Sequence, residues 1–371
     1  MKKLSALLMV MALLLLGGCA SQPASPALPL SWDDPVLESA VRGWLRITDG
    51  RVLTSHDTAH IDQIIIRQNL VQFNRGSWQT HDPQDGVLSI ADLSNFPALE
   101  HLNISFTHIS DLGPISEKTL LRELYIYNNW EVRDISPLAG LPNLEILILH
   151  NNPIEDFTAL TQIPSLVELE LYRSYITGID LAGNFPNLER LNIERNNISD
   201  ISFLAGAPTI TDLNLRGNNI DDISVLGFLP NLERLVISNT GVSDLSILYH
   251  LPIERLDISR TGFDDLSVVS GFHGLTHLYF RANGITTLEP ISHLTGLVEI
   301  DAGLNYITTA APISGLSQLR ALDLSENPLI TASHITDLRN LSRVVLTGTG
   351  LTGSQLEEVE SGLPMFTAVI Y

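Results

Sequence analysis

Most of the chain repeats one pattern of apolar and polar positions, L-x-x-L-x-L-x-x-N-x-I. Well-formed copies begin at Leu166, Leu188 and Ile210. The polar residue at the ninth position of the pattern recurs every 21 to 23 residues, at Thr107, Asn129, Asn152, Ser174, Asn196, Asn218, Thr240, Thr261, Asn283, Asn305, Asn327 and Thr349. Twelve positions in such close register predict a chain built of stacked repeats, because chance similarity does not keep one period.

The chemistry of the pattern predicts the shape of each repeat. In L-x-L the two leucines point to one side and the residue between them points to the other, as in a β-strand. We expect the leucines of successive repeats to stack into one core, with their strands paired in parallel. The returning stretch, such as Ile198 to Ile201, is too short for a full α-helix and predicts turns and 3₁₀ segments. The predicted fold class is an α/β solenoid with a curved parallel sheet on its concave face and 3₁₀ segments on its convex face.

The asparagine position has a structural interpretation. A carboxamide both donates and accepts hydrogen bonds, so it can satisfy backbone groups of a buried turn that would otherwise lack partners. We assign this role to Asn129, Asn152, Asn196, Asn218, Asn283, Asn305 and Asn327. Threonine or serine at the remaining five positions keeps a hydroxyl but forms fewer hydrogen bonds.

Both ends of a solenoid need caps, because a terminal repeat otherwise exposes the core. Residues 32–60 predict a helical N-terminal cap, with apolar side chains at 37, 41, 44 and 45 on one helical face. Residues 61–69 add a thirteenth copy of the strand motif, so the solenoid spans 61–351. The inserted segment 71–86, VQFNRGSWQTHDPQDG, reads as a polar loop. Residues 352–371 predict a C-terminal cap of one helix and a last strand.

The repeat resembles the 22-residue leucine-rich repeats of bacterial internalins, over about residues 60–371. It also resembles the leucine-rich-repeat subunits that regulate a eukaryotic protein phosphatase. The resemblance to internalins implies the same solenoid with a small helical cap, and a protein that binds other macromolecules. The pattern is highly specific for the fold and weakly specific for the partner.

The first residues predict export. Lys2 and Lys3 precede an apolar run from Leu7 to Leu16, which is about half the length of a membrane-spanning helix and is typical of a signal peptide over 1–18. The sequence that ends at Cys19 resembles the lipobox of bacterial lipoproteins, which implies cleavage before Cys19 and its lipidation. The alternative is an ordinary signal peptide with an incidental cysteine.

The residue after the cysteine adds a location. In the sorting rule of Gram-negative lipoproteins, Ala20 favours the outer membrane, although the sequence does not prove a Gram-negative host. Residues 19–31, rich in proline, serine and alanine, predict a tether between the anchor and the folded part. We therefore expect a lipid-anchored protein of the cell envelope, facing either the periplasm or the exterior.

The formal net charge of -21 argues against nucleic acid as a partner, since phosphate binding depends on a positive surface. The single cysteine can form no internal disulfide and no zinc site alone. His56 and His60 could form a weak metal pair, but surface histidines are the better interpretation. The G-x-G-x-x-G from Gly348 to Gly353 is explained by the repeat. We expect no enzyme, no metal and no cofactor.

The exposed positions of the concave sheet are the candidate binding site. Their aromatic residues gather in the first repeats, at Phe106, Tyr125, Tyr127, His150 and Tyr172. A row of arginines follows, at Arg173, Arg195, Arg216, Arg260 and Arg281. Tyrosine and arginine are enriched in binding hot spots. The alternative is that these residues cover the sheet and pair with nearby acids, such as Arg190 with Glu168.

The sequence therefore predicts a lipoprotein that binds a protein partner, which the arginine row suggests is acidic, through its concave face. One alternative is a structural envelope component that packs against cell-wall glycan or against its own copies. A second is a leucine-rich-repeat regulator of an enzyme. The oligomeric state and the identity of the partner do not follow from the sequence.

Overall fold

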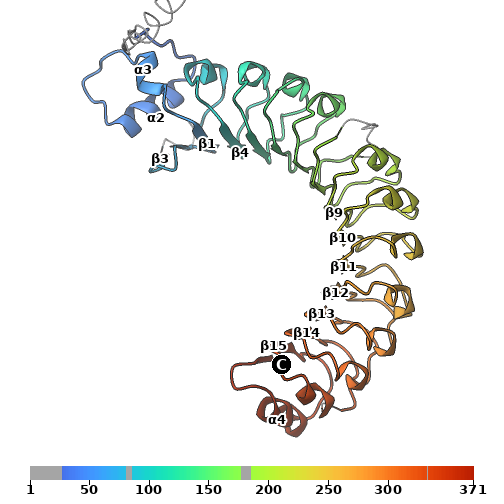
Figure 1. Cartoon of the computed structure of the whole chain (residues 1–371). Coiled ribbons are helices and arrows are strands. Elements are labelled where there is room, and N and C mark those ends of the chain that lie inside the picture. The colour runs from blue at the N-terminus through green and yellow to red at the C-terminus, as the bar shows by residue number, and fades with distance from the viewer. Residues whose placement is uncertain (1–26, 81–85, 177–184, 332) are drawn as a thin grey trace, which may run out of the picture.

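The computed structural model describes residues 27–80, 86–176, 185–331 and 333–371. They form an arc whose strands line the inner side and whose short helices line the outer side (Figure 1). The described strands make one 16-stranded sheet in the order β16-β15-β14-β13-β12-β11-β10-β9-β8-β7-β6-β5-β4-β1-β2-β3. This architecture confirms the predicted solenoid and its parallel concave sheet.

The strands of the repeat pair in parallel and in register. Leu191, for example, lies beside Leu169 on one side and Leu213 on the other. These strands and the cap strand are β1 (Gln63–Arg67), β4 (His101–Ser105), β5 (Glu123–Tyr127), β6 (Ile146–Ile148), β7 (Glu168–Glu170), β8 (Arg190–Asn192), β9 (Asp212–Asn214), β10 (Arg234–Val236), β11 (Arg255–Asp257), β12 (His277–Tyr279), β13 (Glu299–Asp301), β14 (Ala321–Asp323), β15 (Arg343–Val345) and β16 (Ala368–Ile370).

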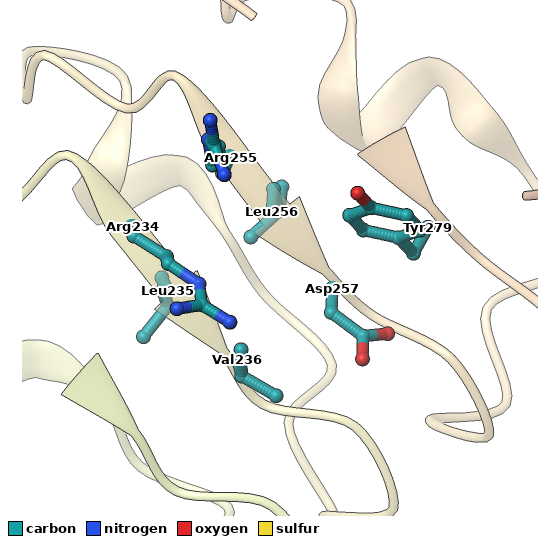
Figure 2. Close-up of a pocket in the computed structure, with 7 residues that line it drawn as sticks. All are labelled: Arg234, Leu235, Val236, Arg255, Leu256, Asp257 and Tyr279. Atoms are coloured by element: carbon teal, nitrogen blue, oxygen red, sulfur yellow. The ribbon is translucent and has the colours of Figure 1, made fainter. Parts of the chain in front are cut away.

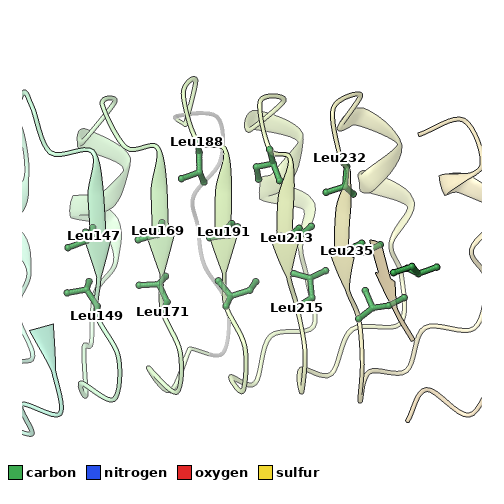
Figure 3. Close-up of a cluster of buried hydrophobic side chains, with 14 of the residues drawn as sticks. Leu147, Leu149, Leu169, Leu171, Leu188, Leu191, Leu213, Leu215, Leu232 and Leu235 are labelled. Carbon is green, nitrogen blue, oxygen red and sulfur yellow. The ribbon is translucent and has the colours of Figure 1, made fainter. Parts of the chain in front are cut away.

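The core is a set of leucine columns that run along the solenoid. Figure 3 shows Leu147, Leu169 and Leu213 at one level of neighbouring strands, with Leu149, Leu171 and Leu215 at the next. Each of these side chains is fully buried. Burying a leucine contributes about 1.5–3 kcal/mol, so the two apolar strand residues of each turn, together with the buried side chains of the convex turns, hold adjacent repeats together.

The convex side consists of single 3₁₀ turns, as predicted from the short returning stretch. They are η1 (Ala91–Asn95), η2 (Gly113–Glu117), η3 (Ser136–Leu138), η4 (Thr158–Gln162), η5 (Ser202–Gly206), η6 (Ser224–Phe228), η7 (Ser246–Leu248), η8 (Leu266–Val269), η9 (Glu289–Ile291), η10 (Ala311–Ile313) and η11 (Ser333–Asp337).

A short acceptor side chain starts most of these turns. The carboxylates of Asp200, Asp222 and Asp244 each accept a hydrogen bond from the N–H of the serine two residues later. That bond lowers the pKa of each aspartate, since it favours the charged form. Thr287 and Thr309 use their hydroxyls in the same way in later repeats. The aspartates that recur just before the 3₁₀ turns are therefore turn caps.

The N-terminal cap contains two helices, α2 (Pro35–Leu45) and α3 (Ser55–Thr58). Buried Asp34 caps α2, where one carboxylate oxygen accepts from the N–H groups of Val36 and Leu37. Its other oxygen accepts from the backbone near residue 88, and buried Asp92 of η1 accepts from the N–H groups of residues 33 and 34. Two buried carboxylates therefore join the cap to the first repeat.

The segment after β1 differs from its prediction as a polar loop. Its first residues form β2 (Leu70–Phe73), which pairs antiparallel with β1, and β3 (Gln79–Thr80) pairs with β2. Val71 and Phe73 are fully buried. The prediction as a loop was wrong. The outer edge of β1 needs hydrogen-bond partners, and this hairpin supplies them.

The C-terminal cap consists of α4 (Gly353–Gly362) and β16. Thr352 and Gln355 form a capping box at the start of α4, which satisfies backbone N–H groups of its first turn. Val359 is buried against the last repeat. Within the described residues, no helix is long and apolar enough to span a bilayer.

Candidate concave binding face

Four predicted aromatic residues form a continuous strip over three strands. Tyr125 stacks on Tyr127 with ring centroids 6.1 Å apart, His150 meets Tyr127 edge-on at 5.3 Å, and Tyr172 meets His150 edge-on at 5.6 Å. They project from β5 and from the ends of β6 and β7. We call Tyr125, Tyr127, His150 and Tyr172 the aromatic strip. All four are half-buried, so one side of the strip faces solvent.

Acidic neighbours fix the polar atoms of the strip. The Tyr125 hydroxyl donates to Glu123 at 3.0 Å, and His150 Nε2 lies 2.8 Å from Glu170. Hydrogen bonding to His150 lowers the pKa of Glu170. Burial raises the pKa of Tyr127 to about 12, so its phenol stays protonated and can donate a hydrogen bond to a partner.

Two arginines border the strip at Tyr172. Arg173 lies 5.3 Å from the centre of the Tyr172 ring and Arg195 lies 5.8 Å from it, and Arg195 also donates to the Tyr172 hydroxyl at 2.9 Å. The ring of Phe106 contacts no ring of the strip, although its backbone N–H donates to the Tyr127 carbonyl at 3.0 Å. Phe106 is 45% exposed, and the guanidinium of Arg67 lies 5.5 Å from its ring centre.

The predicted arginine row is two columns rather than one. Arg173, Arg195 and Arg260 occupy the turn position just before the asparagine slot, where the backbone is left-handed, with φ of 51 to 57°. Arg216 and Arg281 stand one residue earlier, followed by left-handed Gly217 and Ala282. The two columns follow from the distance of each arginine to its slot, but the left-handed backbone does not, because phenylalanine, asparagine, arginine, leucine and glutamate all occupy that position.

Acids neutralise much of the arginine charge. Glu194 lies 3.5 Å from Arg195 and 3.8 Å from Arg216. Arg281 lies 3.5 Å from both Asp301 and Asp323. Arg190 pairs with Glu168 at 2.6 Å, as the alternative interpretation of the row proposed. Arg260 makes no ion pair with the described residues.

The concave face is balanced in charge at the four positions that stand six, four, two and one residues before each slot. On the thirteen repeat strands these positions carry ten arginines and ten acids. The arginines are Arg67, Arg173, Arg190, Arg195, Arg216, Arg234, Arg255, Arg260, Arg281 and Arg343. The acids are Glu123, Glu168, Glu170, Glu194, Asp212, Asp257, Glu299, Asp301, Asp323 and Glu326. The net charge of -21 therefore comes from the rest of the chain.

The mid-strand acids and amides have a role that the sequence analysis missed. In five of them a side-chain oxygen accepts a hydrogen bond from the backbone N–H two residues later, as Asn192 does from Glu194 and Asp323 from Ser325. The others are Asn214, Asp257 and Asp301. The asparagine or aspartate that recurs between the two leucines of L-x-L could have indicated this role, because such short side chains often bond the backbone N–H two residues later.

The asparagine slots lie behind this face, in the turns. Asn152 donates to the carbonyls of Ile126 and His150 and accepts from the N–H of Asn129. The remaining slots bond backbone groups in the same manner, at Asn129, Asn196, Asn218, Asn283, Asn305 and Asn327. Asn196 and Asn283 are half-buried, whereas the other five are buried.

Cys19, the predicted lipidation site, lies outside the described residues. The predicted histidine pair lies in the N-terminal cap. His60 stacks on Trp44 in the N-terminal cap, with ring centroids 5.6 Å apart. Asp57 between the two histidines is bound by Arg51 at 2.6 Å. In the described ranges, no three His, Cys, Asp or Glu side chains are grouped to hold a metal ion.

Comparison with known proteins agrees with the fold. The family model of leucine-rich repeats in two copies matches residues 119–162, 164–206 and 208–250. The chain has the leucine-rich-repeat solenoid fold. No curated protein matches it. Leucine-rich-repeat proteins typically mediate protein–protein interactions.

Three solved structures, one of them an internalin, share the leucine-rich-repeat solenoid fold. An internalin from Listeria monocytogenes is 24% identical with a TM-score of 0.76, over 94% of this chain and 99% of the other. A leucine-rich-repeat protein from Leptospira interrogans is 20% identical with a TM-score of 0.63, over 76% and 81%. The ectodomain of a receptor kinase from Arabidopsis thaliana, in complex with Casparian strip integrity factor 2, is 18% identical with a TM-score of 0.51, over 70% and 40%.

Proposed function

We propose that this leucine-rich-repeat protein binds a protein partner through its concave face, with the aromatic strip as the anchor. The observation that supports this proposal is the unbroken series of ring contacts from Tyr125 to Tyr172. These rings lie on the exposed side of the sheet, so the leucine core does not require them. A half-buried aromatic run is preorganised and loses little conformational freedom on binding.

The balanced charge of the face changes the expected partner. Because arginines and acids are equally numerous on it, the concave face has no excess positive charge that would attract acidic proteins in general. We expect recognition by rings and by individual hydrogen bonds, with the two cations around Tyr172 at the border of the contact.

The test uses a double variant of the strip. We expect Tyr125→Ala with Tyr172→Ala to abolish capture of envelope proteins without lowering the melting temperature, since both side chains lie outside the core. Truncating two hot-spot aromatics costs about 4 kcal/mol of binding, or roughly a thousandfold in affinity. Photo-crosslinking at Tyr127 in intact cells identifies the partner.

The matched control is Tyr306→Ala. Tyr306 is 64% exposed but lies in a turn near the far end of the solenoid. Capture should survive this change. Undiminished capture by the strip double variant would contradict the proposal. If the parent protein captured no protein but co-sedimented with purified peptidoglycan, the alternative of an envelope component that binds glycan would be favoured.

We also propose that a lipid on Cys19 holds the protein in the outer membrane. The support is the lipobox-like sequence that ends at the chain's one cysteine and is followed by Ala20. Cells fed an alkyne-labelled palmitate should label the full-length protein, and Cys19→Ser should remove the label and release the protein from membranes. A protein that fractionates with the outer membrane after Cys19→Ser would rule out this anchor.

A further inference from the structure

The concave face contains a cavity beyond the aromatic strip. A cavity of about 240 Å³ crosses β10, β11 and β12, lined by Arg234, Leu235, Val236, Arg255, Leu256, Asp257 and Tyr279 (Figure 2). Val236 occupies the mid-strand position that carries Asn214, Asp257 and Tyr279 on the neighbouring strands. Its short side chain makes a low floor, and Tyr279 stands at one side.

The polar groups available in this cavity are hydrogen-bond donors. Arg255 is exposed, and its guanidinium makes no ion pair or hydrogen bond with the described residues. Asp257 accepts from the N–H of Ser259 at 2.9 Å, and Figure 2 shows its carboxylate turned away from both arginines. Burial raises the pKa of Tyr279, so its hydroxyl remains a donor. Arg234 is held by Asp212 at 2.9 Å.

We propose that this cavity receives the carboxylate of one acidic side chain on the bound partner. The inference rests on the proposed function, because it assigns a second contact on the same concave face. Arg255 offers the planar pair of N–H groups that binds a carboxylate in bidentate fashion. Tyr279, from the adjacent strand, lines the other side of the cavity, where its hydroxyl can donate to the bound carboxylate in place of Glu299.

The surroundings favour a single negative charge over a phosphate. A second hollow of about 340 Å³ shares Arg234 and Arg255 and is also lined by Asp212, Glu233 and Glu254. Three acids against Arg234 and Arg255 leave one net negative charge, which disfavours a dianion about twice as strongly as a monoanion. Recognition therefore depends on the geometry of the guanidinium, and the partner segment carries an isolated aspartate or glutamate rather than an acidic run.

The experiment titrates the purified protein, labelled with ¹⁵N-arginine, with the peptide acetyl-Gly-Gly-Glu-Gly-Gly-amide at low ionic strength. We expect a saturable shift of the Arg255 Nε–Hε signal, and no shift with the peptide that carries glutamine in place of glutamate. For Arg255→Gln, observed through the Arg234 signal, affinity should fall about tenfold, as expected for loss of a hydrogen bond to a charged group.

Arg343→Gln is the matched control. Arg343 occupies the same strand position on β15, is exposed, and forms no ion pair with described residues, but it lines none of these hollows. The proposal is overturned if Arg343→Gln weakens binding as much as Arg255→Gln, if the glutamine peptide binds equally well, or if no saturable shift occurs. The double variant of the aromatic strip should bind the glutamate peptide normally, so failure of either proposal is recognised separately.

Discussion

The asparagine slot shows how one side chain can hold a repeat together. Asn152 is fully buried and bonds three backbone groups, two carbonyls and one N–H, that belong to its own turn and to the preceding repeat. Threonine at the equivalent position does less. The Thr240 hydroxyl donates to the carbonyl of Ile237 alone. The slot residue therefore forms more hydrogen bonds to the backbone in some repeats than in others.

This gradation leads to a residue-scale prediction. Asn152→Ala removes the side-chain partner of the Ile126 carbonyl and of the Asn129 N–H, whereas the His150 carbonyl keeps the N–H of Asn128. The change should cost about 2 kcal/mol of unfolding free energy, at about 1 kcal/mol or more for each of the two groups. Asn152→Thr should recover about half of that loss, because its hydroxyl replaces one bond. Urea unfolding followed by circular dichroism measures both.

Asn219→Ala is the control for this series. Asn219 stands directly after a slot and is exposed, so its removal should cost less than about 0.5 kcal/mol. If Asn219→Ala and Asn152→Ala lost equal unfolding free energy, the hydrogen bonds of the asparagine slot would not be the source of the stability.

At the scale of elements, predictability followed the range of the interactions. Strands such as β8 and β9 were predicted because their L-x-L alternation is written within a few residues and repeated at a fixed period. The β1–β2 hairpin was missed, although the alternation of Val71 and Phe73 is present, because its reason is the exposed edge of β1. The link between Asp34 and Asp92 was also missed, since it joins residues 58 positions apart that share no local pattern.

The candidate site was predictable in part for the same reason. The repeat period places Tyr125 and Tyr172 on one face, so the concentration of aromatics could be read from the sequence. The ring contacts could not, because they depend on rotamers. The left-handed backbone just before each slot could not be read either, because side chains as different as Phe106 and Arg195 occupy that position.

At the scale of the whole molecule, the notable property is the separation of charge. The concave face balances its arginines and acids, whereas the remaining surface carries the net charge of -21. Self-repulsion among those acids destabilises the folded chain at neutral pH. It weakens as carboxylates take up protons, so moderate acidification from pH 7 toward 5 should raise the melting temperature slightly.

Stronger acid should have the opposite effect. The turn caps Asp134, Asp200, Asp222, Asp244 and Asp265 have pKa values lowered by backbone hydrogen bonds. A carboxyl group whose pKa is lower in the folded than in the unfolded chain stabilises the fold above its unfolded pKa of about 3.9, and loses this effect as pH falls through its folded pKa. Burial raises the pKa of Asp92 and Asp301, which opposes the trend at two positions. The five caps should outweigh them, so we expect the melting temperature to fall below about pH 4.

A matched pair of variants separates the two effects of acid. Asp200→Asn with Asp222→Asn keeps an oxygen that accepts the serine N–H but removes the titrating group, so stability should fall less between pH 5 and 3 than in the parent protein. Asp221→Asn and Asp264→Asn remove the same two charges from neighbouring exposed aspartates whose carboxylates accept no hydrogen bond from the described residues, so only self-repulsion should change. If both pairs lose stability equally with acid when melting is followed by calorimetry, the turn caps do not control the acid sensitivity, and the net charge of the convex surface does.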